Sequence, residues 1–127
     1  MAGNAVVVSR LLAALRQGDE AAVAAELHPE VEATGQRGTK RGISDVVTWA
    51  KPTVDGHLVS RVEVDEAREI GAEWVAVAAR RQWRWAATGE LADEEGFGVL
   101  FRIRDGRVLR WDQTFPALAD AIDAIPA

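Results

Sequence analysis

Apolar residues recur at helical spacing through the first half of the chain. Val8, Leu11 and Leu15 lie three or four positions apart, which predicts an amphipathic helix ending at Gly18, with Asp19 as the cap of the next helix. The segments predicted in this half are helices at 4–17, 20–27 and 43–50, a short strand at 31–33, and a glycine-rich loop at 35–42.

From residue 57 onward the period changes from helical to alternating, which is typical of half-buried strands. The predicted elements are strands at 57–68, 73–87, 93–104 and 107–115, followed by a closing helix at 116–125. Asp105-Gly106 is a strong hairpin signal between the last two strands. Helices on one side of a curved antiparallel sheet predict an α+β architecture.

Because successive strand residues point to opposite faces, the alternation divides this sheet into two surfaces. One face is aromatic and aliphatic, with three polar exceptions, Arg81, Glu95 and Gln113. The other face is a stripe of arginines, namely Arg80, Arg84, Arg102, Arg104 and Arg110.

Polar groups on an apolar face need partners, because burying an unpaired charge or amide costs about 2 kcal/mol or more. Either these three residues lie at the solvated margin of the sheet, or they converge in an aromatic-walled pocket for a small molecule. For the pocket, the residues expected to contact the ligand are Trp49, Trp83, Trp85, Phe97, Val99, Trp111 and Phe115.

Composition narrows the classes of function. The 127 residues form one domain spanning 1–127, and the absence of cysteine excludes disulfides and thiolate chemistry. A net charge of -5 argues against nucleic acid as a partner, and no apolar run is long enough to cross a membrane. We therefore expect a cytoplasmic protein, and the two isolated histidines predict no metal site. We also expect no cofactor.

The arginine stripe has two interpretations. It can be a solvated sheet face laced with acids such as Glu63, Asp65 and Asp112. Alternatively it is a homodimer interface through the outer sheet face, in which arginines pair with carboxylates of a second subunit and Trp74 is an anchor.

Short motifs run in a characteristic order along the chain. They are Arg16-Gln17-Gly18-Asp19, Leu27-His28-Pro29-Glu30-Val31-Glu32, Gly42-Ile43-Ser44, Phe101-Arg102-Ile103-Arg104-Asp105-Gly106-Arg107-Val108 and Arg110-Trp111-Asp112-Gln113-Thr114-Phe115. Together they resemble the SnoaL-like branch of the nuclear transport factor 2-like superfamily, over nearly the whole chain. The resemblance implies a cone-shaped α+β barrel in which three N-terminal helices, a curved sheet and a short C-terminal helix enclose a deep pocket, commonly in a homodimer.

The family's catalytic positions can be compared one by one. Members similar to ketosteroid isomerase use a tyrosine and two acids, and these positions fall on Leu11, near Gly35 and on Val99. Since that mechanism needs a carboxylate and oxyanion donors, we expect no isomerase chemistry of that kind.

Members similar to limonene epoxide hydrolase or to the SnoaL-type cyclases place an acid at about the position of Gln113. An amide can bond a carbonyl or a water, but it cannot take up a proton at neutral pH. A bulge in the last strand would turn Asp112 inward in place of Gln113.

Three hypotheses follow. In a cofactor-independent enzyme acting on a hydrophobic, oxygen-bearing molecule, Arg81 holds a developing negative charge, Gln113 orients a carbonyl or water, and Glu95 or His57 is the base. A binding module would keep the pocket without the chemistry. A dimerisation scaffold would fill the cavity with its own tryptophans.

Overall fold

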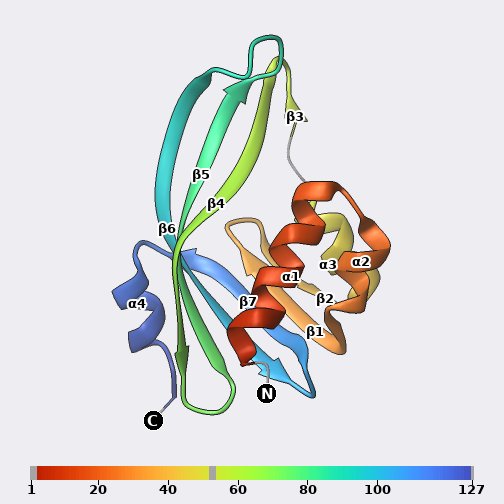
Figure 1. Cartoon of the computed structure of the whole chain (residues 1–127), viewed down its shortest axis with the longest axis vertical. Coiled ribbons are helices and arrows are strands. Elements are labelled where there is room, and N and C mark those ends of the chain that lie inside the picture. Colours follow the sequence, from red (N-terminus) through yellow and green to blue (C-terminus); the bar gives the residue numbers. More distant parts are fainter. Residues whose placement is uncertain (1–2, 52–53, 127) are drawn as a thin grey trace.

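The chain folds into helices on both sides of one sheet (Figure 1). The structure is a computed structural model and describes residues 3–51 and 54–126. Within these residues the elements are α1 (Asn4–Gln17), α2 (Glu20–Ala25), β1 (Leu27–Gly35), β2 (Gly38–Arg41), α3 (Ile43–Ala50), β3 (Val54–Asp55), β4 (Leu58–Ile70), β5 (Trp74–Trp85), β6 (Leu91–Arg104), β7 (Arg107–Phe115) and α4 (Leu118–Asp123).

The boundaries of α1 and α3 agree with the prediction, and those of α2 do not. Gly18 ends α1 at a φ of 67°, and the Asp19 side chain accepts a hydrogen bond from the backbone N–H of Ala22. Helix α2 stops at Ala25, because Leu27 already pairs with β7 as the first residue of β1.

The strands form one curved sheet in the order β2-β1-β7-β6-β5-β4-β3, which confirms the α+β class. Two details differ from the prediction. β1 pairs with β7 in parallel, so the sheet is mixed, and it stays open, with β2 and β3 at its edges instead of closing a barrel.

The glycine-rich segment predicted as a loop contains the edge strand β2. Its residues pair with β1 in an antiparallel register, where the hydroxyls of Thr34 and Thr39 lie 3.0 Å apart. Arg41 also pairs with Glu32 at 2.7 Å. These cross-strand contacts, which single-residue propensities do not reveal, hold the segment extended.

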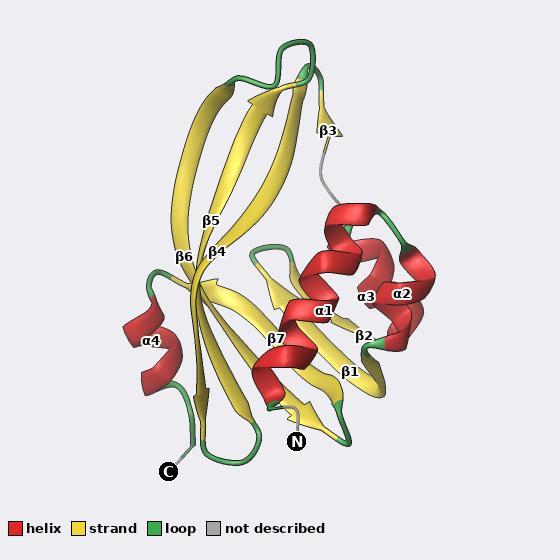
Figure 2. Ribbon diagram, in the orientation of Figure 1, coloured by secondary structure: helices red, strands yellow, loops and turns green. Residues whose placement is uncertain are grey.

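Helices lie on opposite faces of the sheet (Figure 2), and each side holds its own apolar cluster. Helices α1–α3 cover one face, where Val8, Leu11 and Phe101 belong to the main core. Helix α4, shorter than predicted, packs on the other face against Ala76 and Leu100. The outer face is therefore partly covered by the protein itself.

The long strands β4, β5 and β6 extend past the helical layer (Figure 2). Register shifts interrupt the β4–β5 pairing after Val64 and the β5–β6 pairing after Trp83, as expected of strands that bend. In the described part of the chain, no helix is both long and apolar enough to cross a membrane.

Candidate functional site

A cavity of about 770 Å³ lies between the inner face of the sheet and helices α1 and α3. Trp49 of α3 meets Trp111 of β7 edge to face, with ring centroids 5.0 Å apart, and Phe101 lies 5.5 Å from Trp111. Gly35 lets Trp49 approach, since a Cβ there would lie 3.1 Å from the indole Cζ2. The rings of Trp49, Trp111 and Phe101 together form the aromatic floor of the cavity.

Nine of the predicted site residues border this cavity. They are Arg81, Glu95 and Gln113, with Trp49, Trp83, Phe97, Val99, Trp111 and Phe115. They come from α3, β5, β6 and β7. Strand alternation directs the side chains on β5 and β6, and those of Trp111 and Gln113 on β7, to this side of the sheet.

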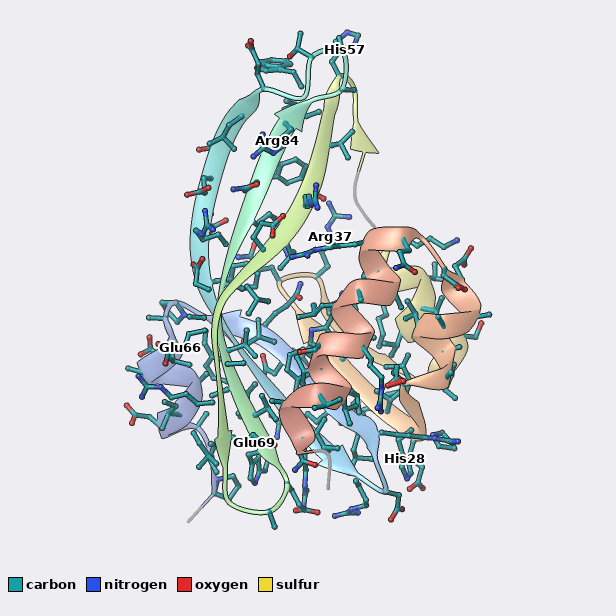
Figure 3. All side chains as sticks on the ribbon, viewed as in Figure 1. His28, Arg37, His57, Glu66, Glu69 and Arg84 are labelled. Carbon is teal, nitrogen blue, oxygen red and sulfur yellow. The ribbon has the colours of Figure 1, made fainter. Side chains whose placement is uncertain are left out.

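His57 and Trp85 do not border the cavity, so the prediction that they contact its ligand is wrong. Figure 3 shows His57 at the tip of the long strands, away from the helices. Both residues border a separate small hollow with Thr88 and Glu90. Trp85 continues the inner-facing positions of β5, but helices α1 and α3 do not extend over this end of the strand (Figure 2). His57 lies in the turn before β4, where its carbonyl accepts a hydrogen bond from the Ala86 N–H.

A bulge in β7 decides which residues of this strand face the cavity. Leu100 pairs with Asp112 and Gly98 with Phe115, so Gln113 and Thr114 together oppose Val99. The bulge follows Asp112, which points away from the cavity, and Gln113 borders the cavity.

The Asp112 carboxylate supports this bulge. Its Oδ1 accepts hydrogen bonds from the Thr114 backbone N–H at 3.0 Å and from Thr114 Oγ1 at 2.6 Å. Beyond the bulge the parity is reversed, so Phe115 borders the cavity only at its rim and packs against the apolar cluster beneath α4.

Arg81 is half-buried in the cavity wall and lies against an aromatic ring of the neighbouring strand. Its guanidinium carbon lies 5.2 Å from the centroid of the Phe97 ring, a cation–π arrangement. Glu95 is its direct register partner on β6. Even so, Arg81 makes no ion pair with any residue that the structure describes.

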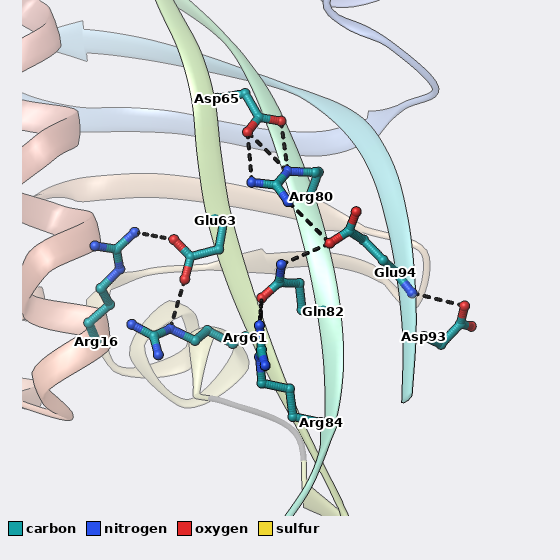
Figure 4. Close-up of polar contacts among 9 residues, drawn as sticks. All are labelled: Arg16, Arg61, Glu63, Asp65, Arg80, Gln82, Arg84, Asp93 and Glu94. Carbon is teal, nitrogen blue, oxygen red and sulfur yellow. Dashed lines mark hydrogen bonds and ion pairs between the residues drawn. The ribbon is translucent and has the colours of Figure 1, made fainter. Parts of the chain in front are cut away.

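The cavity mouth carries cations that the strand pattern does not reveal. Arg16 and Arg61 share the Glu63 carboxylate at 2.7 and 2.9 Å (Figure 4), and Lys51 pairs with Glu20 at 3.1 Å. Arg37 borders the same cavity from the β1–β2 turn. In the sequence, Arg37 stands in the glycine-rich segment 35–42, which also carries Lys40 and Arg41. Arg16 lies on the same side of α1 as Leu12, four residues earlier.

The arginines of the outer face pair within the chain. Arg80 bonds Asp65 and Glu94, Gln82 also donates to Glu94, and Arg84 donates to Gln82 (Figure 4). The hydrogen bond to Asp65 raises the pKa of Arg80. These contacts agree with a face laced with acids.

At the lower end of the same face, Glu73 binds two arginines. Arg102 donates to it at 2.9 Å while lying 5.3 Å from the ring of Trp74, and Arg104 lies 3.4 Å from it. The hydrogen bond from Arg102 lowers the pKa of Glu73 below its usual value, although desolvation acts in the opposite direction.

Across the described residues, no three side chains of the His, Asp and Glu type gather in a group that could hold a metal ion. The polar groups that the strand pattern predicted in the cavity are the guanidinium of Arg81, the amide of Gln113 and the carboxylate of Glu95, and further cations lie at its mouth.

Compared by sequence, the chain matches no protein-family model and none of the curated proteins. Its structure matches an NTF2-like protein of unknown function from Burkholderia pseudomallei over 100% of both chains, with 25% identity and a TM-score of 0.72. An LEH-like epoxide hydrolase from M. tuberculosis matches 92% of this chain and 84% of its own, with 19% identity and a TM-score of 0.68. The chain has the nuclear transport factor 2-like fold.

This fold confirms the resemblance drawn from the motifs. TerC, solved with polyporic acid, shares the nuclear transport factor 2-like fold at 22% identity and a TM-score of 0.67, over 88% of this chain and 90% of its own. In the present nuclear transport factor 2-like chain, Leu11 is fully buried and Val99 nearly so. Both positions therefore hold apolar side chains that are closed off from solvent.

Proposed function

We propose that the chain binds a small, hydrophobic, oxygen-bearing molecule in the cavity between α1, α3 and the sheet. The observation that carries this proposal is the open space of about 770 Å³ above the edge-to-face pair Trp49 and Trp111. Cavities of this size with aromatic walls and a few polar groups are typical of small-molecule sites. The co-crystal of TerC with polyporic acid gives a precedent for a small molecule with this fold.

Open space also weighs against the scaffold hypothesis. A module that filled its cavity with tryptophan would leave no comparable volume, whereas Trp49, Trp83 and Trp111 border the space and do not occupy it.

A second candidate is a cofactor-independent cyclase, isomerase or hydrolase. The observation in its favour is the register of Arg81 opposite Glu95, with Gln113 on the same cavity. In that case Glu95 would accept a proton, Arg81 would hold negative charge developing on an oxygen, and Gln113 would orient a carbonyl or a water.

Tryptophan substitutions test binding directly. A panel of hydrophobic carbonyl compounds and epoxides is titrated against the protein by calorimetry, with Trp49→Phe as the cavity variant and Trp74→Phe as the control. Trp74 is matched in type but packs beneath α4 on the other face of the sheet. We expect Trp49→Phe alone to weaken binding. No heat with any compound, or equal weakening by both variants, would contradict the proposal.

Catalysis is tested separately, by following turnover of the compounds that bind. For an enzyme, Glu95→Gln and Arg81→Met should each lower the rate while the fold is retained. Turnover that survives both changes and Gln113→Ala would rule out the assignment of these residues, whereas binding without turnover would support the binding module.

We also propose that two copies of the chain form a homodimer through the outer face of the sheet. Trp74 is partly covered by α4, so the surface left for a second copy centres on Arg80 and Glu94. Light scattering after size exclusion should show a dimer that Arg80→Glu dissociates. A wild-type monomer would contradict it.

A further inference from the structure

The charge of the cavity differs in sign from the charge of the whole protein. The chain carries a net charge of -5. The ionisable side chains that border the cavity are nevertheless five cations and one acid, namely Arg16, Arg37, Lys51, Arg61, Arg81 and Glu95. Basic groups at the mouth of an acidic protein raise the local concentration of anions.

Two of the five cations are available to a ligand. Arg16 and Arg61 form ion pairs with Glu63. Lys51 forms an ion pair with Glu20 of α2. Arg37 and Arg81, in contrast, form no ion pair within residues 3–51 and 54–126 of the structure. Figure 3 shows Arg37 between the helical layer and the long strands.

Arg81 is positioned to receive an anion. The cation–π contact with Phe97, at 5.2 Å from the ring centroid, places the guanidinium against an aromatic ring and leaves it without an ion pair to any described carboxylate. A planar guanidinium binds a carboxylate or a similar pair of oxygens through two parallel hydrogen bonds. Glu95, its register partner, is exposed and makes no ion pair with it.

We infer that the ligand of this cavity is an anion, a flat apolar ring system that carries a carboxylate or another ionised oxygen. The inference rests on the proposed function and narrows it. The rings lie on Trp49 and Trp111, and the anionic oxygens bind Arg81, with Arg37 closing over them from the β1–β2 turn. The amide of Gln113 bonds a second oxygen of the ligand.

A matched pair of probes tests the inference. Naphthoate and its uncharged amide, naphthamide, have the same rings and nearly the same shape, and calorimetry measures the affinity of each. We expect naphthoate to bind at least about tenfold more tightly, since hydrogen bonds between charged groups are stronger than neutral ones. Added salt should weaken the binding of naphthoate and leave that of naphthamide unchanged.

Three arginine variants show which side chain binds the carboxylate of naphthoate. Arg81→Met should remove the preference for naphthoate while keeping the binding of naphthamide, and Arg37→Gln should reduce the preference. Arg37 is exposed on a turn, so its variant tests the inference even if Arg81→Met fails to fold. Arg107→Gln is the control, because Arg107 is an exposed arginine at the β6–β7 turn that does not border the cavity.

The outcomes separate the two proposals. Equal affinities for the two probes would overturn the anion inference and leave the proposed function standing. An unchanged preference in both Arg81→Met and Arg37→Gln would also overturn it. Binding of neither probe would overturn the inference, and it would overturn the proposed function as well if no compound of the carbonyl and epoxide panel bound.

Discussion

The indole of Trp49 meets the indole of Trp111 edge to face at 5.0 Å, with an angle of 86° between the ring planes. One ring comes from the third helix and the other from the last strand, so the pair links the helical layer to the sheet at the bottom of the cavity. This contact makes the cavity floor part of the hydrophobic core.

Truncation of the floor should therefore unfold the protein more easily. Trp111 is only 5% exposed, so we expect Trp111→Ala to lower the free energy of unfolding by about 3–5 kcal/mol. Urea denaturation measures the change. The control is Trp85→Ala at the tip, where the side chain is 46% exposed and the change should stay within about 0.5 kcal/mol. Equal losses in both variants would contradict the assignment.

Gly98 determines how closely α4 approaches the sheet. A Cβ at this position would lie within van der Waals overlap of the Ala117 carbonyl oxygen, a backbone atom that cannot move aside without α4. We expect Gly98→Ala to destabilise the protein by about 1–3 kcal/mol, as overpacking does elsewhere.

Gly96 is the matched control for that change. It lies two residues earlier on the same strand, and an added Cβ there would meet nothing within 4 Å. Thermal unfolding of Gly96→Ala and Gly98→Ala compares the two. A larger loss in Gly96→Ala would refute the role given to Gly98.

Glu73 should make stability depend on acid pH. Its pKa is lowered in the folded protein, chiefly by the hydrogen bond from Arg102. Its contribution is therefore present above the usual carboxyl pKa of about 4.5 and is lost as the pH falls through the lower folded value.

Denaturation at neutral pH and below the folded pKa of Glu73 checks the sign of this effect. We expect wild type to lose more stability on acidification than Glu73→Gln does. Glu30→Gln, which removes an exposed carboxylate without an ion pair to any described residue, should behave as wild type. An identical acid response in wild type and Glu73→Gln would disprove the prediction.

The bulge in β7 depends on the contact between Asp112 and Thr114. Thr114→Val removes the hydroxyl that donates to Asp112 at 2.6 Å, which should cost about 1 kcal/mol or more. Because Gln113 lies inside the bulge, ligand affinity should fall as well. Thr48→Val, on the exposed side of α3, is the control, and unchanged stability and affinity in Thr114→Val would show that the bulge forms without this bond.

Local patterns predicted much of this molecule. Helical spacing located α1 and α3 to the residue. Strand alternation predicted that Arg81, Glu95 and Gln113 share a face with Trp111, and all four border one cavity. The direction of a side chain along a helix or strand is a property of the backbone period, so a single sequence can carry it.

Only the tertiary structure decided which part of the inner sheet face the helices enclose. Trp85 has the inner-facing parity but lies beyond the helices, and His57 lies in the turn before β4. The bulge after Asp112 places Phe115 in the opposite apolar cluster. Arg16, Arg37 and Lys51 meet at the cavity mouth from two helix ends and a turn. Enclosure depends on register and packing between segments far apart in the chain, and no local period encodes those distances.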